Sequence, residues 1–404
     1  MLTKLKEAVS KAIHFLGLRR NIVGILTMVI LVGMGERMAE RFLPIYLLAL
    51  GGGLISIGVL NGLTNLLSAL YSFPGGYLSD KFGTKRALII FNGMSIAGYL
   101  IVILVPTWIS AIFGAVLFLS WSAISLPASM SLIAEVLPTT KRTMGVSMHS
   151  LVRRVPMALG PLLGGFFISK WGEVVGVRYA FLVALAMAVI AAIMQQILIR
   201  ESQIRYTPQP NPFRLFKQMT ISMKYLLVSD ILIRFCEQIP YAFVVIWAMK
   251  TITHHVSALQ FGVLTAIEMI TAMLVYVPVA YLADKGRKKP FVLITFAIFT
   301  CFPLFLMISK TIWLLVIAFV IRGLKEFGEP TRKALIMDLA PEGAKASAFG
   351  LYYLIRDVLV SFAAFGGAYL WRYSPYSNLL IAAMFGVMGT LWFAVMGKDI
   401  KIAV

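Results

Sequence analysis

The sequence predicts an all-α, polytopic membrane protein with twelve transmembrane helices, arranged as two six-helix bundles related by pseudo-two-fold symmetry. Three observations lead to this prediction: the composition, the number of long apolar stretches and an internal repeat. Hydrophobic residues make up 60% of the 404-residue chain and charged residues only 13%, whereas a soluble domain has about 45–50% apolar and about 25% charged residues. The mean hydropathy is +0.87. A water-soluble protein is therefore excluded.

Twelve apolar stretches are long enough to cross the hydrocarbon core of a bilayer, which is about 30 Å thick and takes roughly 20 helical residues. Six of them lie in each half of the chain, so we expect two bundles of six helices. We refer to them in chain order as spans 1 to 12. They are 21–49, 54–78, 87–105, 108–136, 144–168, 178–199, 226–249, 258–282, 290–309, 311–338, 346–370 and 376–396.

The internal repeat is a short motif that ends an apolar stretch with an acid followed by a basic cluster. Both copies contain Tyr-Leu-x-Asp-Lys, and their acids, Asp80 and Asp284, stand half a chain length apart. Glu135 and Asp338 keep almost the same offset. One motif can recur by chance, but a register kept along the chain indicates a duplication.

A polar, proline-containing stretch at 200–225 interrupts the apolar pattern and predicts a linker. It separates an N-terminal bundle at 21–199 from a C-terminal bundle at 226–404. Residues 1–20 carry apolar side chains at helical spacing opposite lysines, which predicts an amphipathic helix in the membrane interface. Lysines and arginines concentrate on the face that carries the linker and both termini, so we predict that this face is cytoplasmic. We expect a multi-pass protein of the plasma membrane.

The formal net charge of +20 indicates attraction to anionic membrane lipids, because the basic residues flank the predicted spans. Binding of nucleic acid is therefore not expected. Cys236 and Cys301 lie singly in different spans, and the adjacent His254 and His255 lack a third ligand, so we predict no metal site and no cofactor. A membrane-embedded enzyme is disfavoured because the chain has no phosphate-binding loop, no His-Glu-x-x-His and no plausible catalytic triad. We expect the protein to act as a monomer.

Charges within the predicted spans follow a pattern. Spans 3, 6, 9 and 12 have no Asp, Glu, Lys or Arg in their interiors, whereas other spans carry charges at depth. A charge near the bilayer centre costs at least ~2.5–3.5 kcal/mol on insertion scales, so these charges predict a polar cavity lined by protein. The candidate residues of a substrate and proton pathway are Glu36, Arg37, Glu40, Arg153, Arg154, Arg234, Glu237, Glu268, Arg356 and Asp357.

Two arginine–glutamate pairs recur near the start of each half. Arg37 with Glu40, and Arg234 with Glu237, are spaced i,i+3 and can lie on one helical face. Each pair either neutralises itself or holds a carboxyl group that exchanges a proton as its surroundings change. We choose Glu40 first as the proton carrier, because it repeats, sits beside an arginine and precedes Pro44. The carriers that stay open beside it are Glu36, Glu237, Glu268 and Asp357.

Span 10 carries two i,i+4 pairs, Arg322 with Glu326 and Lys325 with Glu329. We interpret both as salt bridges that stabilise packing rather than as ligand contacts. Span 4 has no equivalent set, so we expect the electrostatics of the cavity to be asymmetric. In span 5, Arg153 and Arg154 differ by about 100° around the helix, so at most one of them faces the cavity.

The duplicated motif resembles the cytoplasmic motif between helices 2 and 3 of the major facilitator superfamily, and the twelve-span plan is similar to that family over essentially the whole chain. The resemblance implies that spans 3, 6, 9 and 12 form an outer layer and that spans 1, 4, 7 and 10 line the pathway. It also implies that the motif loops lock the two halves when the cytoplasmic side is closed. The residues of this gating motif are Gly76, Asp80, Gly83, Lys85, Arg86, Glu135, Asp284, Arg287, Lys288 and Asp338.

A glycine-rich sequence in span 5 resembles the Gly-Pro-x-x-Gly-Gly core of a motif found in exporters of that family. Its residues are Gly160, Pro161, Gly164 and Gly165. Upstream positions that are glycine in the family motif are Ser147 and Pro156 here. The alternative interpretation is close packing of membrane helices, which small residues permit.

The sequence therefore predicts a secondary active transporter, similar to the twelve-helix drug/proton antiporters, that exports small organic or amphipathic compounds in exchange for protons. The alternative is uptake or exchange of an organic anion, clamped by cavity arginines such as Arg37, Arg154, Arg234 or Arg356. A membrane-embedded enzyme is less favoured, and a non-transporting receptor is the weakest alternative.

Overall fold

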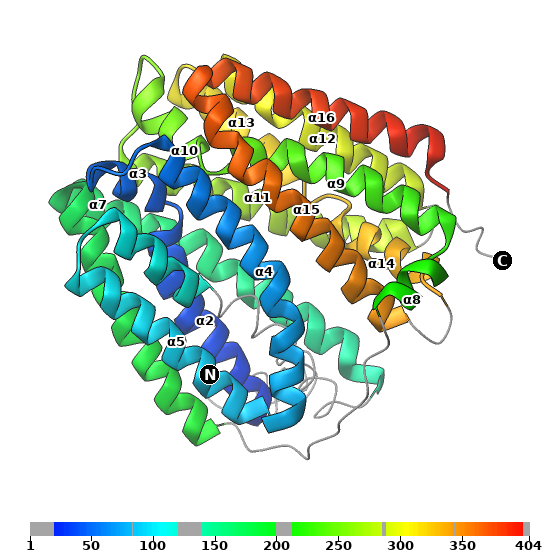
Figure 1. Ribbon diagram of the computed structural model, residues 1–404, viewed down its shortest axis with the longest axis horizontal. Coiled ribbons are helices and arrows are strands. Elements are labelled where there is room, and N and C mark those ends of the chain that lie inside the picture. Colours follow the sequence, from blue (N-terminus) through cyan, green and yellow to red (C-terminus); the bar gives the residue numbers. More distant parts are fainter. Residues whose placement is uncertain are drawn as a thin grey trace, which may run out of the picture.

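The computed structural model describes residues 20–82, 84–119, 139–198, 212–284, 288–341 and 345–398. All regular secondary structure in these residues is helical, as predicted (Figure 1). The N-terminal segment 1–20, predicted to be amphipathic, lies outside the described residues apart from Arg20.

The helices of the first half follow spans 1 to 6. They are α2 (Arg20–Glu40), α3 (Leu43–Ala49), α4 (Leu54–Phe82), α5 (Thr84–Leu104), the helical residues Trp108–Leu119 and α7 (Thr139–Leu198). Span 1 is divided between α2 and α3, and α7 holds both span 5 and span 6. The two parts of α7 meet at Gly172, whose φ of 81° lies in the left-handed region that glycine adopts without strain.

The helices of the second half follow spans 7 to 12. They are α9 (Ile221–Tyr241), α10 (Val244–Ile246), the π-helix η1 (Trp247–Thr251), α11 (Ala258–Asp284), α12 (Lys288–Ile308), α13 (Ile312–Leu324), α14 (Glu329–Leu339), α15 (Lys345–Tyr373) and α16 (Pro375–Met396). Part of the predicted linker 200–225 is helical, because α8 (Pro212–Gln218) and the start of α9 fall within it.

Five helical segments of the described residues are each long and apolar enough to cross a membrane, and α9 with α10 and η1 forms a sixth that is bent by 41°. Span 4 is only partly described, and several other spans are broken or form shorter apolar helices. The helix boundaries are therefore consistent with twelve spans. The breaks explain why fewer continuous spanning helices are present.

The two halves lie close together near α3 and α10 and diverge toward the ends where α2 begins and α16 ends (Figure 1). We call the region near α3 and α10 the far end. The region where α2 begins and α16 ends is the linker end. Helix α7 packs on α11, and α4 packs on α15. These two seams join the halves.

Glycines allow close backbone contact along the seam between α7 and α11. A Cβ atom added at Gly165 would collide with the carbonyl oxygen of Ala258 and lie 3.0 Å from Leu259 Cα. From the opposite helix, a Cβ added at Gly262 would lie 2.5 Å from the carbonyl oxygen of Pro161. Larger side chains at these positions would separate the halves.

The seam between α4 and α15 has the same character. A Cβ atom added at Gly58 would collide with Ala368, and one added at Gly62 would collide with the ring of Phe365. Both seams therefore depend on small residues, as is common in membrane helix packing.

The rest of the span 5 glycine motif packs within the first half. A Cβ added at Gly160 would lie 2.7 Å from Arg37 Cβ on α2, and one added at Gly164 would collide with the carbonyl oxygen of Met38. The residues that resemble the exporter motif thus bring α7 against α2 and α11.

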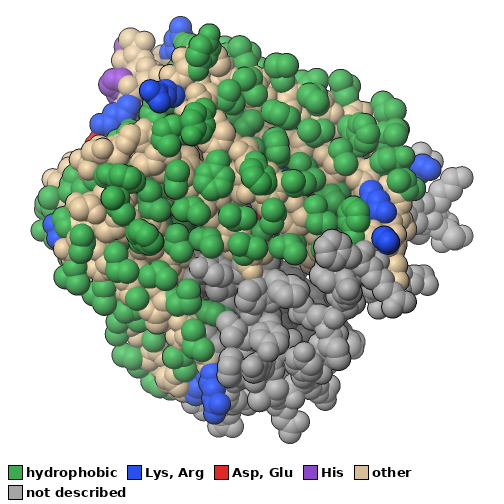
Figure 2. Space-filling model, in the orientation of Figure 1, with side chains coloured by type: hydrophobic (Ala, Val, Ile, Leu, Met, Phe, Trp, Pro, Cys, Tyr) green, Lys and Arg blue, Asp and Glu red, His purple; other side chains and the backbone are tan. Residues whose placement is uncertain are grey.

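The surface in Figure 2 is covered by hydrophobic side chains, and the lysines and arginines that are visible lie toward its edges. Many large apolar side chains are exposed on α16, among them Met384, Leu391 and Val395. Such a surface suits contact with lipid, where exposed apolar side chains carry no cost.

We predict that Gly164→Val lowers the free energy of unfolding by about 1–3 kcal/mol, because the added methyl groups force α7 away from α2. The measurement is the midpoint of thermal unfolding in detergent. The matched control is Gly93→Val on α5, where an added Cβ meets no atom within 4 Å. Equal losses for the two variants would contradict the packing role of Gly164.

Candidate functional site

Two helix breaks lie at corresponding positions of the two halves. Helix α2 ends at Glu40 and α3 begins at Leu43, while α9 ends at Tyr241 and α10 begins at Val244. Pro44 cannot donate a backbone hydrogen bond to the carbonyl of Glu40, which explains the first break. In the second half Pro240 lies in the last turn of α9. The repeated Arg-x-x-Glu motif therefore ends at the break in the first half and one helical turn before it in the second half.

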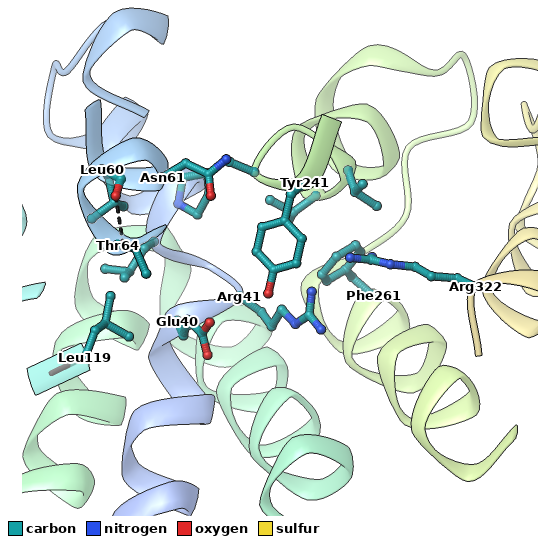
Figure 3. A pocket seen from close by; sticks show the side chains of 14 residues that line it. Glu40, Arg41, Leu60, Asn61, Thr64, Leu119, Tyr241, Phe261 and Arg322 are labelled. Atoms are coloured by element: carbon teal, nitrogen blue, oxygen red, sulfur yellow. Dashed lines mark hydrogen bonds between the residues drawn. The ribbon is translucent and has the colours of Figure 1, made fainter. Parts of the chain in front are cut away.

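A cavity of about 50 Å³ lies between the two breaks (Figure 3). This volume holds a few water molecules, since one water needs roughly 10–15 Å³. Its lining residues come from α2, α3, α4, α9, α10, α11, α13 and the helical stretch 108–119, with Ala242 between α9 and α10. They are Glu40, Arg41, Leu43, Pro44, Leu60, Asn61, Thr64, Leu119, Tyr241, Ala242, Val244, Val245, Phe261 and Arg322. None of these residues belongs to span 3, 6, 9 or 12, in agreement with the predicted outer layer.

The charged pair of the first half forms as predicted. Arg37 donates to the carboxylate of Glu40, and its Nη2 lies 3.6 Å from Glu36 Oε1. Glu36 is buried, whereas Glu40 reaches the cavity. The two acids therefore share one arginine.

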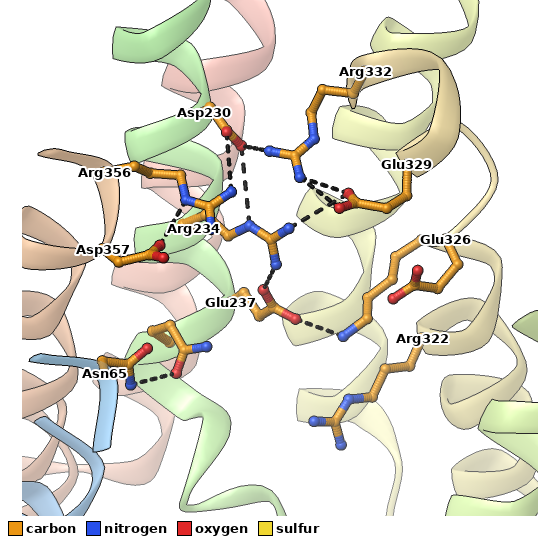
Figure 4. Close-up of polar contacts among 12 residues, drawn as sticks. Asn65, Asp230, Arg234, Glu237, Arg322, Glu326, Glu329, Arg332, Arg356 and Asp357 are labelled. Atoms are coloured by element: carbon orange, nitrogen blue, oxygen red, sulfur yellow. Dashed lines mark hydrogen bonds and ion pairs between the residues drawn. The ribbon is translucent and has the colours of Figure 1, made fainter. Parts of the chain in front are cut away.

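The corresponding pair of the second half also forms, and it acquires a third member. Arg234 Nη1 lies 2.5 Å from Glu237 Oε2, and Lys325 Nζ lies 2.6 Å from Glu237 Oε1 (Figure 4). Lys325 thus bonds Glu237 rather than Glu329, so the predicted i,i+4 pair of Lys325 with Glu329 is wrong. The nearer carboxylate belongs to the neighbouring helix α9.

Glu268 of α11 lies among three cationic side chains. Arg322 Nε lies 3.3 Å from it, and Lys325 Nζ and Arg41 Nη2 each lie 3.9 Å from it. Its side chain is 1% exposed, and neither oxygen accepts a hydrogen bond from a described residue. Since Arg322 faces Glu268, the predicted pair of Arg322 with Glu326 is also wrong, and Figure 4 shows no contact between them.

Asp230 is a functional candidate that the sequence analysis missed. It accepts from Arg332, from Arg356 Nη1 at 3.4 Å and from the hydroxyl of Tyr352 at 3.1 Å. Arg356 also donates to Asp357 at 2.7 Å. The available signal was an acid within span 7 placed i,i+4 to Arg234, and the two do approach to 4.0 Å.

Glu329 joins this cluster to the second-half pair. Its carboxylate accepts two hydrogen bonds of 2.7 Å from Arg332 and lies 3.4 Å from Arg234. The second half thus contains a continuous network of ion pairs across α9, α13, α14 and α15 (Figure 4).

Polar contacts also cross between the halves near the cavity. Arg154 Nη2 lies 2.8 Å from Glu326 Oε2, and Asn65 donates to Gln238 Oε1 at 3.2 Å. Arg154 is therefore the member of the arginine pair that reaches the other half, whereas Arg153 makes no ion pair with any residue that the structure describes. At the far end, Lys250 Nζ lies 2.5 Å from Glu173 Oε1.

The gating motif is only partly described. In its second copy Lys288 bonds Asp338 at the end of α14. In its first copy Lys85 donates to the carbonyl of Gln196 at 3.0 Å, and Arg86 is exposed. Gly83, Glu135 and Arg287 lie outside the described residues, and the structure does not describe the side chains of Asp80 and Asp284 or the surroundings of Gly76.

Within the described residues, no group of three or more His, Cys, Asp or Glu side chains could hold a metal ion. The buried acids instead face arginines and lysines. The site therefore presents charged side chains of both signs to ions or polar groups.

The chain was compared with known proteins. The sequence profile of the Major Facilitator Superfamily matches residues 25–236 and 226–402. The uncharacterized MFS-type transporter MJ1317 of Methanocaldococcus jannaschii is 21% identical over 369 residues, which cover 89% of this chain and 90% of that protein. The crystal structure of a mutant of the nucleoside transporter NupG is similar with a TM-score of 0.76 and 14% identity, over 94% of this chain and 100% of that one. That of the peptide transporter POT in complex with sulfate has a TM-score of 0.76 and 14% identity, over 93% of each chain.

We predict that Arg154 and Glu326 are energetically coupled across the halves. Arg154→Gln and Glu326→Gln should each destabilise the protein by about 1–3 kcal/mol, because each breaks a partly buried ion pair. The double variant should lose less than the sum, by a coupling energy of about 1 kcal/mol or more. The measurement is a double-mutant cycle on thermal unfolding.

The same cycle on Lys250 and Glu173 is the matched control. That pair also crosses between the halves, but Lys250 is 47% exposed, so its coupling should stay below about 1 kcal/mol. Additive losses for Arg154 and Glu326 would show that they act independently.

Proposed function

Because this chain belongs to the major facilitator superfamily of membrane transporters, we propose that it is a proton-coupled secondary active transporter that exports small organic or amphipathic compounds. It works by alternating access, in which the two halves rock around the cavity between the helix breaks. It does so as a monomer in the plasma membrane, with both termini in the cytoplasm.

The observation that carries the proposal is the distribution of buried charge between the halves. In the first half, arginines outnumber acids near the cavity, and Arg41 and Arg154 approach Glu268 and Glu326 of the second half. When the halves rock apart at this level, Glu326 loses the arginine that it pairs with, and Glu268 loses one of its three cations. An unpaired buried charge is costly, and a proton taken up by the carboxylate removes it. Movement and protonation are thereby linked.

Export is supported by the glycine motif of α7. Its residues lie where α7 contacts both α2 and α11, so the helix that joins the halves at the far end carries the sequence that resembles exporters. The direction of flux is tested in right-side-out and inside-out vesicles with an imposed proton gradient. Accumulation only in inside-out vesicles supports export, and accumulation only in right-side-out vesicles supports uptake.

Uptake or exchange of an organic anion is the second candidate. The arginines first considered for it, Arg37, Arg154, Arg234 and Arg356, all have short contacts with acids. A screen for compounds that raise thermal stability identifies ligands of either candidate, since binding to the native state stabilises it. Flux assays on the hits then separate the two.

We predict that Glu40→Gln abolishes concentrative transport driven by a proton gradient, while binding or passive exchange of substrate survives in part. Glu40 is the acid that both bonds Arg37 and lines the cavity, so its protonation state can respond to movement and to substrate. The measurement is proton-driven flux in proteoliposomes across a range of pH.

The control is Glu173→Gln, which removes an acid outside the cavity and should keep the pH dependence of transport at whatever rate it runs. If Glu40→Gln still pumps against a gradient with its pH dependence intact, Glu40 is only a structural partner of Arg37. Glu36, Glu237, Glu268 and Asp357 are then the acids to substitute.

We predict that Asp80→Asn shifts the population toward the state open to the cytoplasm, because the resemblance to the family motif implies that the Asp80 carboxylate makes charge-assisted contacts that close this side. In the second copy, the corresponding loop supplies Lys288 to Asp338, which supports such contacts. The measurement is alkylation of a cysteine introduced at Ser68 by a membrane-impermeant reagent from the cytoplasmic side, in a background without Cys236 and Cys301.

A cysteine introduced at Thr253, on the far end, provides the control for reagent access from the other side. Faster alkylation at position 68 in the Asp80→Asn variant is the expected result. An unchanged rate would remove Asp80 from the gate.

A further inference from the structure

Two arginines at the cavity carry hydrogen-bond donors that are not used within the described part of the chain. Arg41, from the break in α2, and Arg322, from α13, both line the cavity between the halves. Neither donates a hydrogen bond to a described residue, although each guanidinium has five N–H donors. Arg37 and Arg234, which do not line the cavity, differ in this respect, since they bond the glutamates beside them.

Both guanidinium groups are held in place by the same aromatic ring. The guanidinium carbon of Arg41 lies 5.2 Å from the centroid of the Tyr241 ring, and that of Arg322 lies 5.5 Å from it. Arg322 also lies over Phe302 and Phe319, at 5.1 and 5.7 Å. These cation–π contacts orient the arginines but leave their N–H groups available. Figure 3 shows the side chain of Arg41 beside the Tyr241 hydroxyl, with Arg322 extending toward them from the other half.

The local charge is not balanced. Arg41 and Arg322 together carry two positive charges, and the acid nearest to both is Glu268. Beside this group, Glu36 and Glu40 share Arg37 and leave one negative charge. Arg234 and Lys325 share Glu237 and leave one positive charge, so the two neighbouring groups cancel. The group of Arg41, Arg322 and Glu268 therefore has one excess positive charge in a site where Arg322 is only 2% exposed. One negative charge from a ligand would neutralise it.

We propose that the transported compound is an organic monoanion whose carboxylate or similar group binds between Arg41 and Arg322. Guanidinium groups bind such anions through paired, charge-assisted hydrogen bonds. Because Arg41 belongs to the first half and Arg322 to the second, a bound anion connects the two halves. Without the anion, Glu268 is the acid that faces both arginines. This inference rests on the proposed transport function and names the substrate class for that site.

The remainder of the cavity indicates the body of the compound. Leu60, Leu119 and Phe261 are apolar lining residues, and Asn61 and Thr64 add polar groups on α4. A small, partly apolar molecule with one anionic group therefore matches the lining better than a cation or a highly polar sugar does.

The test uses the full-length protein in nanodiscs and measures binding by thermal stabilisation and by titration. The probes are propanoate, hexanoate and benzoate, each paired with its primary amide, which keeps the shape and removes the charge. We expect at least one carboxylate to stabilise the protein and its amide to do so weakly or not at all. A series in which every amide matches its carboxylate, or in which no carboxylate binds, overturns the proposal.

Substitutions then locate the site. Arg41→Gln and Arg322→Gln should each weaken binding of the carboxylate roughly ten- to hundredfold, the value of a charge-assisted hydrogen bond. Arg372→Gln, which removes an exposed arginine at the far end of α15, should leave it unchanged. Glu268→Gln should instead tighten binding, because it removes the carboxylate that competes for the same two arginines. A tighter complex cannot result from misfolding. Retained affinity in both arginine variants overturns the proposal.

Flux assays separate this inference from the proposed function. If proton-driven transport of a neutral or cationic compound survives both arginine substitutions, the transport function stands and the anion site is wrong. If carboxylates bind through the arginines but no gradient drives any flux in proteoliposomes, the anion site stands and the transport function is wrong.

Discussion

A charged side chain inside a membrane is stable only where an opposite charge or a hydrogen-bonding partner lies beside it. The interior of this protein is organised by that constraint. Glu237 faces Arg234 and Lys325, while Asp230 faces Arg332 and Arg356. Since these partners come from four different helices, each ion pair also fixes how the helices are rotated and how deep they sit. The ion pairs therefore also hold the helices of the second half in position.

The two halves meet the constraint differently. The acids and bases of the second half pair mostly among themselves, through α9, α13, α14 and α15. The first half has fewer acids near the cavity, and Arg41 and Arg154 turn to acids across the interface. A sequence repeat has thus produced two bundles of similar shape and unequal charge. Because the charges are unequal, the pairing of charged side chains at the cavity changes when the halves move relative to each other.

At the far end the halves are joined by close helix packing, together with the ion pair of Lys250 and Glu173. Glycines at 58, 62, 165 and 262 bring backbones into contact along both seams, and van der Waals contacts of this kind vanish over short distances. The attraction across such seams is therefore lost as soon as the helices separate slightly. Ion pairs at the cavity, in contrast, still attract each other at a few ångströms of separation. The helix breaks after Glu40 and Tyr241 lie between the glycine seams of the far end and the ion pairs at the cavity. That is where motion of either half changes the lining of the cavity.

The sequence by itself predicted twelve spans, with which the helix boundaries are consistent, and it determined which of them carry charge, because hydropathy and helical length are properties of one segment at a time. It also predicted the pairs of Arg37 with Glu40 and Arg234 with Glu237, whose spacing is set by a single helix. It did not predict that Arg322 faces Glu268, that Lys325 bonds Glu237 or that Asp230 binds Arg332. Those contacts depend on the rotation and depth of neighbouring helices, which no local pattern encodes. Only the tertiary structure therefore decided which arginines remain available in the cavity.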